Sequence, residues 1–186
     1  MQKEINFSNL EIRKLRETDF VMNFDCGDAD LNEFLKHEAS LYKQHLLAVS
    51  YVIVNKDNPS EVLGFCSMAN DKVALGDFGN KTEFNRFRKK QGFPQSKRLK
   101  SYPAIKLCRL GVSAKYKNLH LGSFLIDFMR GYFTSDNKSG CRFMTVDAYL
   151  NAIPFYQKNG FKCLDEVNEG DPHTRLLFCD LRRIRA

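Results

Sequence analysis

The stretch from Arg109 to Ser123 places polar and basic residues between an apolar run and the start of an amphipathic pattern. It predicts a buried strand, a polar turn and the first turn of a helix. A helix N-terminus presents unpaired N–H groups and a partial positive charge, which suits a phosphate-bearing ligand, and Lys115 and Lys117 add charge. The alternative is an ordinary strand–helix connection. The stretch lacks the glycine patterns of a P-loop and of a dinucleotide-binding fold.

Basic side chains concentrate in residues 81–100, where Phe84, Phe87 and Phe93 are interleaved with them. Such a mixture can contact phosphates and stack on bases, which makes the segment a candidate nucleic-acid contact. A solvated basic face anchored by the three phenylalanines, or a dimer contact, are the alternatives. The candidate contact residues are Arg86, Arg88, Lys89, Lys90, Lys97, Arg98 and Lys100.

The pattern in the first half of the chain predicts three strands of a sheet and one helix. The expected strands are residues 10–15, 46–54 and 62–68, of which the last two form a hairpin. Apolar residues from Leu31 to Tyr42 recur at helical spacing, and Asp30 with Glu33 predicts a capping box at the helix start. Residues 70–103 break this pattern and predict a long connection or an inserted helical excursion.

The second half predicts strand–helix–strand units. The expected strands are residues 104–112, 143–146, 161–164 and 175–181, with an amphipathic helix from Leu121 to Phe133. A short helix holding Phe155 and Tyr156 ends at Gly160, the position of a left-handed cap. Early hairpins followed by strand–helix units predict an α/β fold with a mixed sheet.

The composition narrows the class of protein. The 186 residues fit one domain, and 43% apolar residues with 16 Phe are enough for a packed core. No stretch has the roughly 20 apolar residues of a membrane helix, and the N-terminus lacks a signal-peptide pattern. Six widely spaced cysteines without such a signal favour reduced thiols in a cytoplasmic protein, and no clustered zinc ligands occur. Residues 81–100, with eight basic residues and one acidic, carry a net +7, the same as the whole chain.

Two motifs give the sequence a family resemblance. Arg109-Leu110-Gly111-Val112 is similar to the central strand of the GCN5-related N-acetyltransferases (GNAT), and Lys117 to Gly122 to their pyrophosphate loop. Residues 152–161, with Phe155-Tyr156 and Gly160-Phe161, resemble the hallmark Ala-x-x-Phe/Leu-Tyr-x-x-x-Gly-Phe. The resemblance covers roughly residues 10–181. It implies a single domain, 1–186, with a basic insertion at about 70–103 and a mostly antiparallel sheet whose strands splay near 104–112 and 141–147.

The resemblance implies acetyl-CoA as cofactor. Its pyrophosphate would lie on the loop of Lys117, Asn118, Leu119, His120, Leu121, Gly122 and Ser123, and its pantetheine along the strand of Leu110, Gly111 and Val112. Asn151 is a further candidate contact, or else a helix cap. One departure stands out, because His120 occupies the first glycine position of the loop. It leaves open whether the histidine weakens cofactor binding or contacts phosphate itself.

By the same resemblance, Tyr156 is the proton donor to the departing thiolate; its alternative role is that of a half-buried aromatic. A phenol with an ordinary pKa of about 10 is protonated at pH 7 and can donate. No general base is evident, and Asp147 and Glu166 are candidates by position only. An α-amine, which titrates near 8, needs a weaker base than lysine does, and this favours an α-amino acceptor.

A narrower resemblance bears on the acceptor. Phe24-Asp25-Cys26-Gly27, followed by Leu31 and Phe34-Leu35, is similar to the N-terminal signature of GNAT toxins that acetylate aminoacyl-tRNA. Those proteins also carry a strand similar to Pro103–Val112. A loop followed by an amphipathic helix is the structural role of the same residues.

Three hypotheses follow for the function. The first is a GNAT toxin that acetylates the α-amine of aminoacyl-tRNA and has an antitoxin as its partner. The second is a GNAT enzyme acting on a small amine or a peptide. The third is a non-enzymatic acyl-CoA- or RNA-binding module whose loop is degenerate at His120. A homodimer is compatible with each of them, and none requires a membrane.

Overall fold

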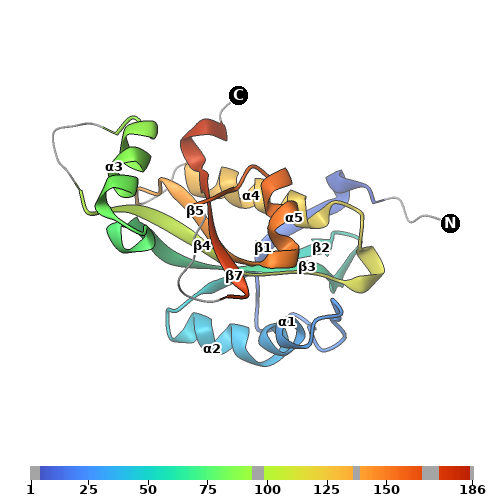
Figure 1. The fold of residues 1–186 in the computed structure, drawn as a ribbon. Coiled ribbons are helices and arrows are strands. Elements are labelled where there is room, and N and C mark those ends of the chain that lie inside the picture. Colours follow the sequence, from blue (N-terminus) through green and yellow to red (C-terminus); the bar gives the residue numbers. More distant parts are fainter. Residues whose placement is uncertain (1–4, 94–98, 136–138, 165–171, 185–186) are drawn as a thin grey trace. The chain divides into compact units, whose positions relative to one another are not determined.

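The computed structural model (Figure 1) describes residues 5–93, 99–135, 139–164 and 172–184. Within these residues it has a seven-stranded sheet with helices beside it. The strands are hydrogen-bonded in the order β1-β2-β3-β4-β5-β7-β6. Packing divides the chain into two units, residues 1–69 with 107–132 and residues 70–106 with 133–186. Strands β3 and β4 each run from one unit into the other. This is the predicted mixed, mostly antiparallel α/β fold.

The first unit is built on an antiparallel ladder. Its strands are β1 (Leu10–Lys14), β2 (Val49–Asn55) and the first part of β3 (Asn58–Ala74). Strand β2 is buried on both faces: Val52 and Val54 join the core cluster of Phe34, whereas the Tyr51 ring meets Tyr132 on the other face. Burial on both faces explains why its sequence is a continuous apolar run.

The helical stretch after β1 packs on the face of Val52 and Val54. It consists of α1 (Ala29–Glu33), a π-helical turn η2 (Phe34–Glu38) and α2 (Ala39–Gln44), and it buries Phe34, Leu35 and Ala39. The predicted capping box at Asp30 is wrong, because Asp28 is the N-cap and its carboxylate accepts the Leu31 N–H at 3.0 Å. Asp30 instead lies in the first turn.

The first unit is completed by the end of β4 (Ser101–Val112) and by most of α4 (Leu121–Thr134). Helix α4 begins at the predicted residue and buries Leu121, Leu125, Ile126 and Met129 at helical spacing.

The second unit contains the first part of β4 together with β5 (Phe143–Tyr149), β6 (Lys162–Cys163) and β7 (Thr174–Asp180). Strand β4 pairs with β5 in parallel from Ala104–Phe143 to Lys106–Thr145, and both strands continue past this short register, as a splay requires. The unit also holds α3 (Lys81–Lys90) and α5 (Ile153–Lys158). Residues 70–74, expected in the irregular segment, extend β3, and α3 is the helical excursion.

Among the described residues, no helix is long and apolar enough to span a membrane. All six cysteines are free thiols.

Candidate acetyl-CoA site and acceptor region

The end of β4 is held by close packing in the first unit. A Cβ built on Gly111 would lie 2.7 Å from the Phe65 ring and 3.5 Å from the Cys26 sulfur, so only glycine fits there without displacement. The Arg109 guanidinium lies 5.1 Å from the centre of the Phe34 ring, a cation–π contact. Residues from the strand motif and the N-terminal signature therefore pack on each other.

The loop after β4 has a backbone conformation typical of glycine at two positions that are not glycine. Asn118 and His120 both have left-handed conformations, with φ of 64° and 59°. Glycine adopts this region without strain, asparagine tolerates it, and other residues adopt it at a cost. His120 thus preserves the path of the chain at the position where the family pattern has glycine.

The first turn of α4 carries the donors expected of a phosphate site. The Phe124 N–H bonds to the His120 carbonyl at 3.0 Å, the first bond of the helical ladder. The N–H groups of Leu121, Gly122 and Ser123 precede that bond and have no carbonyl one turn earlier within the helix. The exposed Lys117 side chain lies close to Gly27 of the N-terminal signature, since a Cβ built on Gly27 would lie 3.2 Å from the Lys117 Nζ.

The N-terminal signature folds into a hydrogen-bonded loop. The Asp25 carboxylate accepts from the Gly27 N–H and from the Asn32 amide, each at 2.8 Å, and the Cys26 N–H donates to Asn32 at 2.9 Å. The hydrogen bond from Gly27 and that from Asn32 lower the pKa of Asp25. The Ala114 N–H donates to the Asp25 carbonyl at 2.8 Å, which ties this loop to the turn after β4.

The aromatic hallmark has a structural explanation in the second unit. The Phe161 N–H bonds to the Tyr156 carbonyl at 3.0 Å and the Gly160 N–H to Gln157 at 2.9 Å, with Gly160 at φ 79°. These bonds form a Schellman motif at the end of α5, and the Tyr156 and Phe161 rings add its usual apolar contact at 5.5 Å. The motif fixes the backbone of Tyr156, a buried residue.

The remaining predicted residues of this region have varied surroundings. Asn151 is exposed, and because Ala152 is the N-cap of α5, Asn151 is not its cap. Asp147, a candidate general base, forms an ion pair with Lys106. Glu166 lies outside the described residues.

Helix α3 presents the basic segment. Lys81, Arg86, Lys89 and Lys90 are exposed, Arg88 is half-buried, and Lys100 is exposed before β4. Phe84 and Phe87 are buried in the core with Phe143, and Phe93 stacks on Tyr102 at 3.9 Å. Base stacking on Phe84 and Phe87 is therefore wrong, and these rings anchor the helix. Lys97 and Arg98 lie outside the described residues.

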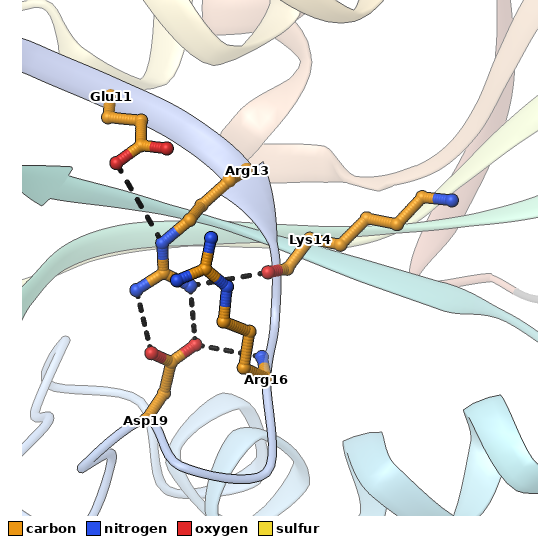
Figure 2. Close-up of polar contacts among 5 residues, drawn as sticks. All are labelled: Glu11, Arg13, Lys14, Arg16 and Asp19. Carbon is orange, nitrogen blue, oxygen red and sulfur yellow. Dashed lines mark hydrogen bonds and ion pairs between the residues drawn. The ribbon is translucent and has the colours of Figure 1, made fainter.

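Sequence reasoning missed two features of the first unit. One is the Arg13–Asp19 pair, in which two guanidinium nitrogens meet two carboxylate oxygens at 2.7 Å (Figure 2). The other is a cavity of about 210 Å³ that borders Phe20 and Lys115. The charge complementarity of Arg13 and Asp19 is visible in the sequence, but the cavity depends on contacts between distant segments.

Comparison with protein-family models bears on the class of protein. Residues 92–174 match the family model described as an acetyltransferase (GNAT) domain. This match confirms the predicted resemblance to GNAT acetyltransferases and agrees with the predicted class of enzyme.

Three of the solved structures that resemble this chain share its fold over nearly their whole length, which confirms the predicted fold. AtaT complexed with acetyl-methionyl-tRNAfMet has a TM-score of 0.73 and 21% identity, covering 93% of this chain and 95% of that one. AtaTR bound with AcCoA gives 0.71 and 19%, covering 95% and 96%. A Tyr-to-Phe mutant of KacT gives 0.69 and 22%, covering 94% and 96%.

Proposed function

We propose that the protein transfers the acetyl group of acetyl-CoA to the α-amine of aminoacyl-tRNA. The observation that carries this proposal is the likeness to AtaT complexed with acetyl-methionyl-tRNAfMet, which spans nearly all of both chains. The N-terminal signature supports it, since Phe34 packs against Arg109 of the proposed cofactor strand.

In this proposal the loop from Lys117 to Ser123 binds the pyrophosphate of acetyl-CoA. The residues fit such a group, because the left-handed backbone at Asn118 and His120 leads into the start of α4, whose first N–H groups have no carbonyl one turn earlier within the helix. Lys117 adds a positive charge, and Asn151 is a further proposed contact.

Leu110, Gly111 and Val112 are proposed to hold the pantetheine and the thioester. A backbone N–H of this strand end would donate to the carbonyl oxygen and stabilise negative charge as the amine attacks. Acetyl-CoA supplies an activated acetyl group, so the protein's task is to orient it and to manage the protons.

Tyr156 is the proposed proton donor. As the carbon–sulfur bond breaks, its hydroxyl would give a proton to the departing thiolate. The attacking amine must be neutral, and an α-amine that titrates near 8 supplies a neutral fraction at pH 7. The surplus proton of the amine leaves to solvent, since Asp147 is paired with Lys106.

The partners belong to the same proposal. Exposed basic residues of α3, with Lys97, Arg98 and Lys100, would contact tRNA phosphates, and the protein would act in the cytoplasm, where charged tRNA occurs. A Tyr-to-Phe mutant of the AtaT toxin has been solved bound to the C-terminus of the antitoxin AtaR and to acetyl-CoA. By analogy we propose a toxin with an antitoxin as partner; a homodimer is compatible with this.

The test is acetyl transfer from labelled acetyl-CoA to charged and to uncharged tRNA. We expect label on charged tRNA alone, and a loss of about 10²–10⁴-fold in kcat for Tyr156→Phe. Tyr42→Phe, which removes a phenol elsewhere, should keep wild-type turnover. Acetyl-CoA binding without transfer to charged tRNA would point to a small amine as acceptor. No binding at all would contradict both enzyme hypotheses.

A further inference from the structure

The cavity of the first unit has no role in the proposed chemistry. It measures about 210 Å³ and lies between the segment before α1, the start of β3 and the turn after β4. These three segments contribute Phe20, Asn23, Glu61, Val62 and Lys115, among others, to its lining. Pockets for drug-sized ligands measure about 300–1,000 Å³, so this one suits a single ring system.

The three walls are joined by backbone hydrogen bonds. The Ser113 N–H donates to Leu63 at 2.9 Å, and the Ala114 N–H donates to Asp25 at 2.8 Å. Within the segment before α1, the Phe24 N–H closes a turn on Val21 at 2.9 Å. The cavity is therefore preformed by connected backbone, which lowers the entropy cost of binding.

A buried ion pair holds the exposed wall in place. Both terminal nitrogens of Arg13 meet the Asp19 carboxylate, which also accepts the Arg16 N–H at 2.8 Å (Figure 2). The side chains of Arg13 and Asp19 are only 11% and 7% exposed. Phe20 directly follows this anchor, so its backbone position is fixed although its ring is exposed.

The lining combines the groups that recognise a nucleobase. Phe20 is 56% exposed and offers an aromatic face for stacking, while Phe24 and Val62 form a buried apolar floor. The Asn23 amide can donate and accept at a base edge, as amides do with adenine. Lys115 supplies an ammonium, 3.7 Å from Glu61, that can contact the phosphate on the ribose of the same nucleotide.

We propose that this cavity binds the base of an adenine nucleotide. Two substrates of the proposed reaction carry such a base, namely acetyl-CoA and the 3′-terminal nucleoside of aminoacyl-tRNA. The choice between them rests on the proposed function. Binding of the base does not, because it depends only on the groups that line the cavity.

Direct titration tests the pocket without the reaction. Adenosine 5′-monophosphate is added to the full chain and followed by NMR, for the wild type, Phe20→Ala and Met22→Ala. Met22 is a matched control, since it is 51% exposed on the same segment and does not line the cavity. We expect Phe20→Ala to weaken binding about 5- to 100-fold, as loss of one stacking contact does, and Met22→Ala to have no effect. Absence of wild-type binding, or equal binding by Phe20→Ala, would overturn the proposal.

Kinetics then identify the source of the base. If it is acetyl-CoA, Phe20→Ala raises the KM for acetyl-CoA and leaves that for acetyl-pantetheine, which lacks the nucleotide, unchanged. If it is the acceptor, the KM for charged tRNA rises and that for an aminoacyl ester without a nucleoside does not. An unchanged KM for both substrates overturns the assignment to this reaction. A wild type that transfers no acetyl group refutes the proposed function, and the titration still decides the pocket.

Discussion

At the scale of the residue, His120 and Gly111 test how tightly the proposed cofactor loop and strand specify their side chains. His120 has a left-handed backbone, whose cost for a residue with a Cβ is about 1 kcal/mol. We expect His120→Gly to raise the free energy of unfolding by up to about 1 kcal/mol, measured by chemical denaturation. Asn118→Gly is the control, because asparagine tolerates the same conformation; an equal gain there would contradict the explanation.

Isothermal titration calorimetry of the His120→Gly variant with acetyl-CoA decides what the His120 side chain does. If the backbone N–H groups bind the pyrophosphate, His120→Gly should keep or improve acetyl-CoA affinity, because the path of the loop is retained. A fall of tenfold or more in affinity, with the loop still folded, would show instead that the imidazole itself contacts phosphate.

Gly111 is constrained by space and not by its backbone angle. The added methyl of Gly111→Ala would meet the Phe65 ring, so we expect a loss of about 1–3 kcal/mol in the free energy of unfolding. Gly131→Ala, inside α4 with nothing within 4 Å of the new Cβ, should instead stabilise by about 0.5–1 kcal/mol. Thermal denaturation of both variants gives opposite shifts if the packing around Gly111 is as described.

At the scale of the element, the Schellman motif of α5 links stability to the proposed acid. Gly160→Ala forces a Cβ into a left-handed conformation, so the helix end should lose about 1 kcal/mol. Because the motif fixes the Tyr156 backbone, kcat should fall more than the KM for acetyl-CoA rises. Lys158→Ala, within the same helix but outside the cap bonds, is the control and should change neither value.

The stability of the segment between β1 and α1 depends on pH because of the Asp19 carboxylate. Burial would raise the pKa of Asp19, but hydrogen bonds from Arg13 and from the Arg16 N–H outweigh it and hold the pKa below the ordinary value of 3.8. A carboxyl with a lowered pKa contributes stability above pH 3.8 that is lost as the pH falls through its folded-state pKa. Asp19→Asn should therefore destabilise the protein at pH 7 and have little effect near pH 2. An equal effect at both pH values, measured by urea denaturation, would contradict the ion-pair explanation.

At the scale of the whole molecule, the periodicity of apolar residues predicts helices and strands. Tertiary contacts determine their caps and their buried faces. Helix α4 begins at Leu121 as its apolar spacing indicates, because one stripe of side chains faces the core. The N-cap of α1 is Asp28 and not the predicted Asp30. Either carboxylate can cap a helix, and only the backbone path into the helix determines which of them does. The sequence leaves Phe84 and Phe87 either to stack on bases or to anchor the basic segment, because sequence alone does not reveal which face of α3 is buried.

The net charge of +7 belongs to one segment, and this gives the last prediction. Residues 81–100 carry the whole excess, and α3 turns its phenylalanines inward, so Arg86, Lys89, Lys90 and Lys100 stay exposed to solvent. Each phosphate contact steepens the dependence of log affinity on log salt by about 0.7–0.9. Replacing these four residues by alanine should weaken tRNA binding and flatten that slope by up to about 3.

A matched variant separates local contacts from net charge. Four exposed lysines outside the segment, Lys14, Lys43, Lys158 and Lys162, are replaced by alanine to remove the same charge. If α3 contacts the phosphates, this control should keep nearly the wild-type slope in filter-binding titrations between about 50 and 200 mM salt. Equal flattening by both variants would mean that long-range charge, and not the α3 surface, attracts the tRNA, since a diffuse field depends on total charge and a contact depends on position.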